Sequence, residues 1–293
     1  MKKCLLLLLF IPGINVNVFP VDFTVIPDMP YTINNIPSQS LDVYIPEGTG
    51  LMPCVVWIHG GAWLAGSKDG LAPEVENLLH QGYVIASINY RLSSEAIFPA
   101  QIHDCKAAVR FLKENAAKFL IDTSKIAVAG SSAGGHLAAL VGTSAGVDTL
   151  EDMSLGYTRA TSRVQAVINY YGPSDFLIMD NLPDSCKEPM AHLVPDSPES
   201  KLLGCTITEC PDRVAFANPV TYITPDDPPF LILHGAIDCT VTPQSNILLA
   251  EELQNKSVPA ELLIIPGVGH GGPEFYSSEI NIKVLNFLGN ILY

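Results

Sequence analysis

The 293-residue sequence predicts an α/β fold, in which a mostly parallel sheet is covered by helices on both faces. Continuous apolar segments such as 54–59 and 84–89 have the pattern of strands buried on both faces, as strands in parallel sheets are. These segments alternate with helical segments, which is typical of parallel sheets with helical crossovers. The length, with 48% hydrophobic residues, is enough for one large domain and excludes a disordered chain.

Each element follows from its local pattern. Strands are expected, in chain order, at 22–26, 40–45, 54–59, 84–89, 125–129, 164–170, 230–234 and 261–265. A helix is expected from Pro99 onward, because Ile102, Cys105 and Val109 recur on one helical stripe. Further helices are expected at 133–141, 244–255 and 277–292.

The segment 176–217 interrupts this alternation. It has little hydrophobic periodicity and many Pro, Asp and Ser residues, which predicts a cap-like insertion over the carboxyl edge of the sheet. Its acidic residues are expected to form a solvated face rather than a site: Asp180, Asp184, Glu188, Asp196 and Glu199.

The N-terminal segment 1–20 predicts a secretory signal peptide. Lys2 and Lys3 form a basic start, the run 4–11 is apolar, and Pro12 follows it. A buried first strand is the alternative interpretation. Residues 21–293 are then expected to form a single domain of an exported protein.

Charge and hydropathy argue against a nucleic-acid partner and against a membrane-spanning helix. The chain has 30 Asp and Glu against 16 Lys and Arg, a formal net charge of −14. A surface of that sign repels phosphate, so no nucleic-acid partner is expected. No apolar run approaches the roughly 18–20 residues that a membrane-spanning helix needs. The sequence does not indicate an oligomeric state.

Of the seven cysteines, six follow the predicted signal peptide. Export would allow disulfides, and Cys205 with Cys210 is the best local pair because it closes a short loop. The pairing of the other four stays open: Cys54, Cys105, Cys186 and Cys239. A metal site is the rival interpretation, but the sequence has no CxxC and no histidine at ligand spacing, so neither metal nor cofactor is expected.

The strongest functional signal is Gly-Ser-Ser-Ala-Gly at residues 130–134, between the predicted strand 125–129 and the predicted helix 133–141. A G-x-S-x-G motif in this context turns the chain sharply and lifts the central hydroxyl above the sheet, so its neighbours must be small. The helix N-terminus behind the serine favours developing negative charge. We therefore predict that Ser132 is a nucleophile and that Ser131 only fits the turn.

A serine hydroxyl needs a base, and His270 is the best candidate. It follows the last predicted strand in a glycine-rich loop, at the edge of the sheet where it can reach Ser132. Five other histidines are expected to pack, to shape loops or to lie on helices: His59, His80, His103, His136 and His234. His192 lies in the segment 176–217 and is less constrained.

An acid must orient the imidazole of the base. Asp238 lies four residues after the strand-ending His234, at the same edge of the sheet, and is the predicted acid. Asp175 is the competing acid, although its Gly-Pro-Ser-Asp setting also fits a turn or a helix cap. Glu274 is interpreted as a loop residue.

An oxyanion hole is predicted directly after the strand 54–59, where small residues let backbone N–H groups approach a substrate. The expected donors are Gly61 and Ala62, with a further one from Ala133. A tight turn without function is the alternative. Trp63 is a candidate substrate-binding residue, either as a wall of the acyl pocket or as a packing residue.

Together these residues resemble the α/β-hydrolase serine esterases, in which nucleophile, acid and base follow the order Ser132, Asp238, His270. The resemblance spans about 41–293 and is to the branch of feruloyl-esterase-like and acetyl-xylan-esterase-like proteins, near the hormone-sensitive-lipase group. It also rests on these segments: 41–46, 89–92, 98–101, 218–222 and 228–235. The resemblance implies structural roles for Arg91 and Asp104.

Two departures weaken an assignment to a subfamily. Residues 59–63 read His-Gly-Gly-Ala-Trp rather than the three-glycine form, and 240–243 read Thr-Val-Thr-Pro where Val-Pro is usual. Neither threatens the predicted mechanism, because alanine keeps its backbone N–H.

The resemblance implies an enzyme that transfers acyl groups through a covalent intermediate, with acetyl or feruloyl esters of plant polysaccharide as substrates. The alternatives are a short-chain carboxylesterase or lipase-like enzyme, and an amide-cleaving relative such as an exopeptidase or arylformamidase. A non-catalytic binding protein is a third hypothesis. Such proteins usually lose a member of the triad, whereas this sequence retains all three.

Overall fold

In the computed structural model, residues 22–187 and 190–293 are described. The predicted signal peptide 1–20 and Glu188 therefore lie outside the described residues. In the described ranges, the sheet has eight strands in the order β1-β2-β4-β3-β5-β6-β7-β8. The β1–β2 and β2–β4 pairs are antiparallel, and the remaining pairs from β4 to β8 are parallel.

The predicted α/β fold with a mostly parallel sheet is confirmed, and every predicted strand overlaps an observed one. The strands are β1 (Phe23–Pro30), β2 (Ser40–Pro46), β3 (Met52–Ile58), β4 (Val84–Ile88), β5 (Ile121–Ser131), β6 (Ala166–Tyr170), β7 (Phe230–Gly235) and β8 (Ala260–Ile265). β5 begins earlier than predicted. The prediction missed its first residues because Asp122, Thr123 and Ser124 are polar, two of them exposed, so they lack an apolar pattern.

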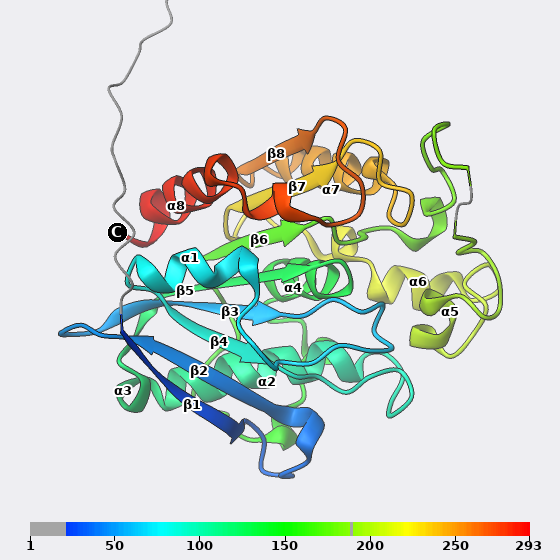
Figure 1. Ribbon diagram of the computed structural model, residues 1–293. Coiled ribbons are helices and arrows are strands. Elements are labelled where there is room, and N and C mark those ends of the chain that lie inside the picture. Colours follow the sequence, from blue (N-terminus) through cyan, green and yellow to red (C-terminus); the bar gives the residue numbers. More distant parts are fainter. Residues whose placement is uncertain (1–21, 188–189) are drawn as a thin grey trace, which may run out of the picture.

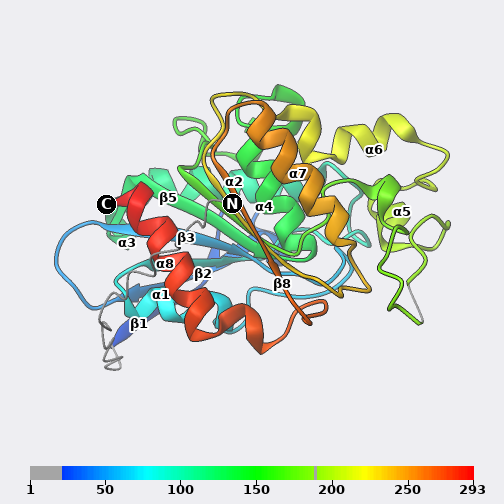
Figure 2. The same ribbon diagram turned by 90° about the horizontal axis from the view of Figure 1, so that it is seen from above.

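Helices cover both faces of the sheet (Figures 1 and 2). One face carries α1 (Pro73–His80) and α8 (Ser278–Leu292); the other carries α2 (Ala100–Glu114), α3 (Ala116–Phe119), α4 (Ala133–Thr143) and α7 (Pro243–Asn255). The side chains of successive strand residues point to opposite faces, so Val55 of β3 packs in the α1 and α8 layer and Val56 in the other. Both residues are fully buried, as continuous apolar strands predict.

Single turns of 3-10 helix connect several elements. They lie at Pro37–Gln39, Asp148–Leu150, Met153–Leu155, Phe176–Ile178, Pro219–Tyr222 and Pro273–Tyr276. The first positions Gln39 so that its amide donates to Asp104 (2.6 Å). Arg91 also donates to both oxygens of that buried carboxylate, at 2.8 and 2.7 Å. This network joins the start of β2, the end of β4 and α2, in keeping with the structural roles that the resemblance implies.

The segment 176–217 lies beyond the carboxyl ends of the parallel strands and contains α5 (Pro198–Leu203) and α6 (Pro211–Ala217) (Figure 1). Its predicted Cys205–Cys210 disulfide is confirmed. A second disulfide joins Cys186 of this segment to Cys239, in the loop after β7. The segment is thus covalently attached to the edge of the sheet that it covers.

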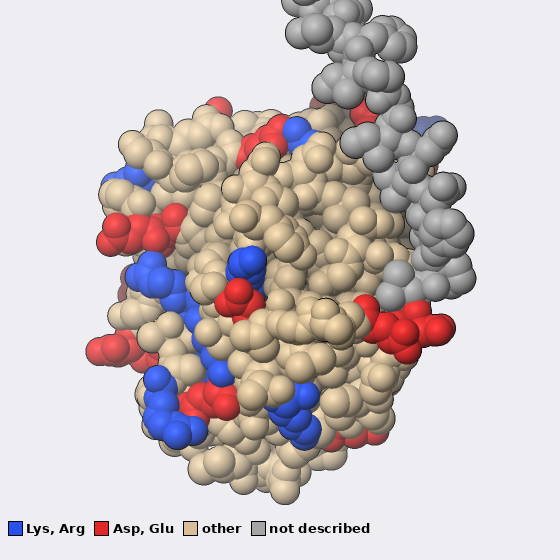
Figure 3. Space-filling view, turned by 90° about the vertical axis from the view of Figure 1, so that its left-hand side faces the viewer, with Lys and Arg blue, Asp and Glu red and all other residues tan. Residues whose placement is uncertain are grey.

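Positively and negatively charged residues are intermixed on the side of the molecule where the parallel strands begin (Figure 3).

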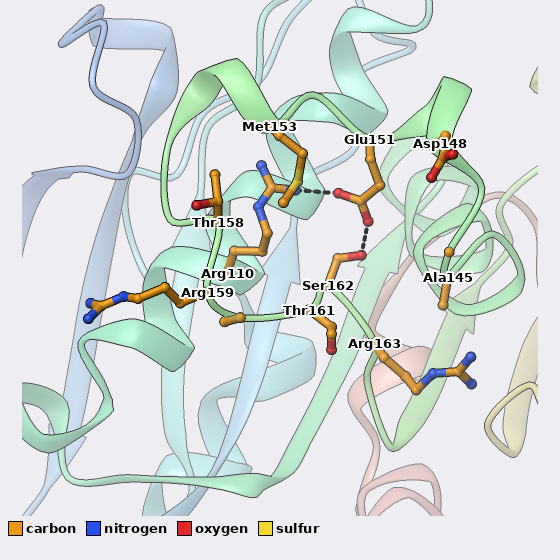
Figure 4. A pocket seen from close by; sticks show the side chains of 12 residues that line it. Arg110, Ala145, Asp148, Glu151, Met153, Thr158, Arg159, Thr161, Ser162 and Arg163 are labelled. Carbon is orange, nitrogen blue, oxygen red and sulfur yellow. Dashed lines mark hydrogen bonds and ion pairs between the residues drawn. The ribbon is translucent and has the colours of Figure 1, made fainter.

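A cavity of about 490 Å³ lies beyond the C-terminal end of α4. In it, Arg110 and Ser162 both donate to Glu151 (Figure 4). Because these polar groups pair with one another, the cluster holds α2 against the segment 145–163.

The disulfides should differ in their effect on stability. Cys186 and Cys239 are 53 residues apart, whereas Cys205 and Cys210 are 5 apart. Chain entropy predicts a loss of about 4 kcal/mol when the longer loop is opened and about 2 kcal/mol for the shorter one. Urea unfolding of the two double-serine variants, each compared with wild type, measures this difference. An equal or smaller loss for the Cys186→Ser and Cys239→Ser pair would contradict the prediction.

Candidate active site

The site is built on a sharp turn between β5 and α4. Ser132 sits between the last residue of the strand and the first residue of the helix, with φ +54° and ψ −120°. This conformation is costly for a residue with a side chain, so the surrounding structure must maintain it. The Ser132 N–H donates to the carbonyl of Tyr170 at the end of β6 (2.9 Å), which ties the turn to the neighbouring strand.

Two glycines make room for this turn. A Cβ atom on Gly134 would lie 2.0 Å from the carbonyl oxygen of Ile58, and one on Gly130 would lie 2.3 Å from the carbonyl oxygen of Gly134. Helix α4 therefore packs directly on the end of β3 with no side chain between them. The flanking residues of the motif are small for this steric reason, as the sequence predicted.

The structure brings Ser132, His270 and Asp238 into one chain of hydrogen bonds. The Ser132 hydroxyl lies 2.9 Å from His270 Nε2, and His270 Nδ1 lies 2.7 Å from Asp238 Oδ2. His270 and Asp238 come from the loops after β8 and β7. The three residues meet because the carboxyl ends of parallel strands share one edge of the sheet.

Asp238 is fully buried, and its carboxylate is held from several sides. Oδ1 accepts hydrogen bonds from the N–H groups of Thr240 (2.8 Å) and Val241 (2.9 Å). Burial alone would raise the pKa of Asp238, but hydrogen bonds from His234 and His270 outweigh it and hold that pKa well below its usual range. The carboxylate is therefore ionised at neutral pH.

His234 contributes more than the loop-shaping role that the sequence predicted. Its Nε2 lies 3.2 Å from Asp238 Oδ2 and 2.9 Å from the carbonyl oxygen of Val241. Its Nδ1 lies 2.7 Å from the side-chain amide of Asn246 on α7. The ring thus supports the same carboxylate that His270 contacts. The four-residue spacing between His234 and Asp238 was the available signal for this contact.

The loop after β3 presents free backbone donors beside Ser132. Gly61, Ala62 and Trp63 all have positive φ angles, of 110°, 55° and 56°. Within the described residues, the N–H groups of Gly61, Ala62 and Ala133 donate no hydrogen bond. Gly61 and Ala62 line a cavity of about 370 Å³ together with Ser132 and His270. The predicted oxyanion donors thus lie around Ser132, and their N–H groups are free to bind an oxyanion.

Trp63 both packs and lines a cavity. Its side chain is 2% exposed, and its ring contacts those of His136 and Phe176 edge to face. It also borders a small cavity at Ser132. The packing interpretation is therefore confirmed, and the substrate-binding role of Trp63 stays a prediction.

The competing residues have other partners. Burial lowers the pKa of His136 to about 4, and its Nε2 lies 2.7 Å from the carbonyl oxygen of Ala217, so this ring is neutral and packed. Asp175 caps the turn at Phe176–Ile178 by accepting from the N–H of Leu177 (2.9 Å). Neither side chain is bonded to Ser132 or His270.

The expectation that all acidic residues of the segment 176–217 form a solvated face is wrong for Glu199. This residue is 2% exposed, and its Oε1 lies 3.0 Å from His192 Nδ1. Asp180 accepts from the N–H of His192 (2.8 Å). Glu199 is buried because α5 folds back against the loop that carries His192, a contact that local composition does not reveal.

In the described parts of the chain, no group of three or more His, Cys, Asp and Glu side chains is arranged to hold a metal ion. The same residues include no helix that combines the length and apolarity needed to cross a membrane.

Comparison with known proteins places this geometry in a family. The BD-FAE family model matches residues 41–253. The chain belongs to the BD-FAE family. The matched segment contains Ser132 and Asp238, whereas His270 lies after it. The α/β-hydrolase fold and the predicted resemblance to serine esterases are thereby confirmed.

Two further relatives of this BD-FAE chain are solved structures. One, described as a truncated form of carbohydrate esterase from gut microbiota, is 33% identical with a TM-score of 0.84 and covers 91% of this chain and 95% of that one. The other is an acetyl ester-xyloside bifunctional hydrolase from Caldicellulosiruptor lactoaceticus, 25% identical with a TM-score of 0.70, covering 86% and 89%.

Among curated proteins, esterase LipC of Mycobacterium tuberculosis is 35% identical over 240 residues, which are 80% of this chain and 57% of LipC. The chain spans about half the length of the curated relatives that it matches first.

The close packing at the turn predicts that Gly134→Ala is destabilising. The added methyl group overlaps the carbonyl of Ile58, and such overpacking costs about 1–3 kcal/mol or more. A methyl group on Gly289 in α8 would meet no atom within 4 Å, so Gly289→Ala should be neutral or stabilising by up to about 1 kcal/mol. Thermal unfolding of both variants is the measurement; equal midpoints would contradict the predicted overlap.

The lowered pKa of Asp238 predicts a pH-dependent contribution to stability. The ionised carboxylate stabilises the fold above its unfolded pKa of about 4, and this contribution is lost as pH falls toward the lower folded pKa. The stability advantage of wild type over Asp238→Asn should therefore shrink between pH 7 and pH 3 in urea unfolding. A stability advantage of wild type that stays constant or grows on acidification would contradict this prediction. Asp184→Asn, at an exposed position, serves as the matched control.

Proposed function

We propose that the protein is a serine carboxylic-ester hydrolase that works through an acyl-enzyme. The observation that carries this proposal is the hydrogen-bonded chain from Ser132 through His270 to Asp238. A nucleophile, a base and an acid that orients the base are the parts that such a reaction requires. The names of the relatives, esterase and carboxylesterase among them, support the same reaction class.

In the proposed mechanism, Ser132 Oγ attacks the ester carbonyl carbon while His270 Nε2 accepts the hydroxyl proton. Asp238 stabilises the charged imidazole that forms. The tetrahedral intermediate collapses as His270 returns the proton to the leaving alcohol oxygen. A water molecule, deprotonated by His270, then attacks the acyl-enzyme and releases the acid and Ser132.

The N–H groups of Gly61, Ala62 and Ala133 are the proposed donors to the oxyanion. They are already oriented by the positive φ angles of the loop and by the N-terminus of α4, so little reorganisation is needed during the reaction. One such donor contributes about 10²–10³ to turnover in hydrolases of this type.

Acetyl or feruloyl esters of plant polysaccharide are the proposed substrates. Support comes from the two solved relatives, which are described as a carbohydrate esterase and an acetyl ester-xyloside hydrolase. The proposed location is outside the cytoplasm. Two disulfides among the described residues suit an oxidising compartment, where such bonds persist.

Replacement of the nucleophile tests the proposed mechanism. Ser132→Ala should lower kcat for p-nitrophenyl acetate by at least about 10³-fold, because the attacking oxygen is lost. Ser124→Ala, on the same strand but exposed and remote from the site, should retain wild-type turnover. Wild-type rates in Ser132→Ala, or a folded wild type that hydrolyses no ester, would contradict the proposal.

Acetylated xylan, methyl ferulate and an aryl formamide then separate the substrate classes. Release of acid from the first two supports polysaccharide deacylation. Hydrolysis of the nitrophenyl ester alone favours a general short-chain esterase, and faster amide cleavage favours the amide-cleaving alternative.

A further inference from the structure

Two cavities of different size meet at Ser132. The smaller has a volume of about 50 Å³ and the larger about 370 Å³. Ala62, Ser132 and Thr240 line both, so an ester bound at the serine extends into each of them. One cavity must hold the acyl chain and the other the alcohol, since both groups are attached to the carbonyl carbon under attack.

The position of His270 decides which cavity holds which group. In the proposed mechanism, His270 Nε2 returns a proton to the alcohol oxygen, so the alcohol must lie beside this ring. His270 lines the larger cavity and not the smaller one. The alcohol therefore occupies the larger cavity, and the acyl chain extends into the smaller one.

Most of the wall of the smaller cavity is apolar, and two of its apolar side chains are buried in the core. Trp63 and Met179 are 2% and 1% exposed, and Trp63 packs against His136 and Phe176. This mostly apolar lining suits a hydrocarbon group, which needs no hydrogen-bond partner.

The segment 176–217 closes the far end of this cavity. His192 and Glu199, which are 1% and 2% exposed and 3.0 Å apart, both line it. Separating a buried pair of this kind leaves each polar group without its partner, which is strongly unfavourable. The wall therefore resists the movement that a larger acyl chain would require.

The volumes of the two cavities suit different groups. A single water needs about 10–15 Å³ of such space, so 50 Å³ holds only a few non-hydrogen atoms. That is enough for the methyl group of an acetyl ester and far too little for an aromatic acyl group. Gly60 and Ser131, which line the larger cavity, also line a neighbouring one of about 320 Å³ together with Asp69 and Glu74. Carboxylates of this kind accept hydrogen bonds from sugar hydroxyls.

We propose that the small cavity is the acyl site and restricts the enzyme to acetyl esters of bulky, hydroxyl-rich alcohols, with Met179 as a wall that sets this limit. This inference rests on the proposed esterase function and chooses acetyl over feruloyl within it.

The test is a series of p-nitrophenyl esters with acetyl, propionyl and butyryl groups. For wild type, kcat/KM should fall by about 10-fold or more from acetate to butyrate, because the added methylenes do not fit. Acetylated xylan should be deacetylated, and methyl ferulate should not be hydrolysed. Butyrate or methyl ferulate hydrolysed as well as the acetyl esters would overturn the acyl-site proposal while leaving the esterase function in place. If wild type hydrolyses none of these esters, the proposed function itself fails.

Substitutions in the wall of the small cavity test whether this cavity causes the preference for acetyl esters. Met179→Ala should raise the butyrate-to-acetate ratio of kcat/KM by about 10-fold. Met190→Ala, at a more exposed part of the same wall, should shift the ratio in the same direction. This variant replaces Met179→Ala in the test if Met179→Ala does not fold. Leu177→Ala is the matched control, because Leu177 is exposed, lies two positions before Met179 and does not line the cavity. If the folded variants keep the ratio of the control, the small cavity is not the acyl site.

Discussion

The turn at Ser132 is the constraint on which the rest of the site depends. Its positive φ can persist only because β6 holds the backbone N–H and because Gly130 and Gly134 let α4 lie directly on β3. The same turn places the start of α4 behind the hydroxyl, which supplies a donor at Ala133 and a favourable dipole. The loops after β3, β7 and β8 then need only meet at one edge of the sheet to surround the serine.

Much of this arrangement was predictable because it follows from local rules. Buried strands such as 54–59 are recognisable by their continuous apolar pattern, and parallel strands bring the residues that follow them to one edge. That reasoning chose Asp238 and His270 as neighbours of Ser132, and the structure places them at hydrogen-bonding distances. Their catalytic roles remain predictions.

The position of the segment 176–217 was predicted, but most of its internal contacts were not, for a physical reason. Its fold depends on tertiary contacts rather than on periodicity. Cys186 pairs with Cys239, and Glu199 is buried against His192, so an acidic residue that was expected to be solvated closes a cavity instead. His234 was similarly underestimated, because its contact with Asp238 is set by how the loop after β7 folds.

The central claim is that Ser132 is the nucleophile, and covalent labelling tests it most directly. The mature protein would be treated with a serine-reactive alkylphosphonate, followed by intact mass measurement, peptide mapping and residual activity. We predict one adduct per chain, located on Ser132, with esterase activity falling in proportion to labelling. Full labelling at another residue, or undiminished turnover by protein labelled at Ser132, would contradict this claim.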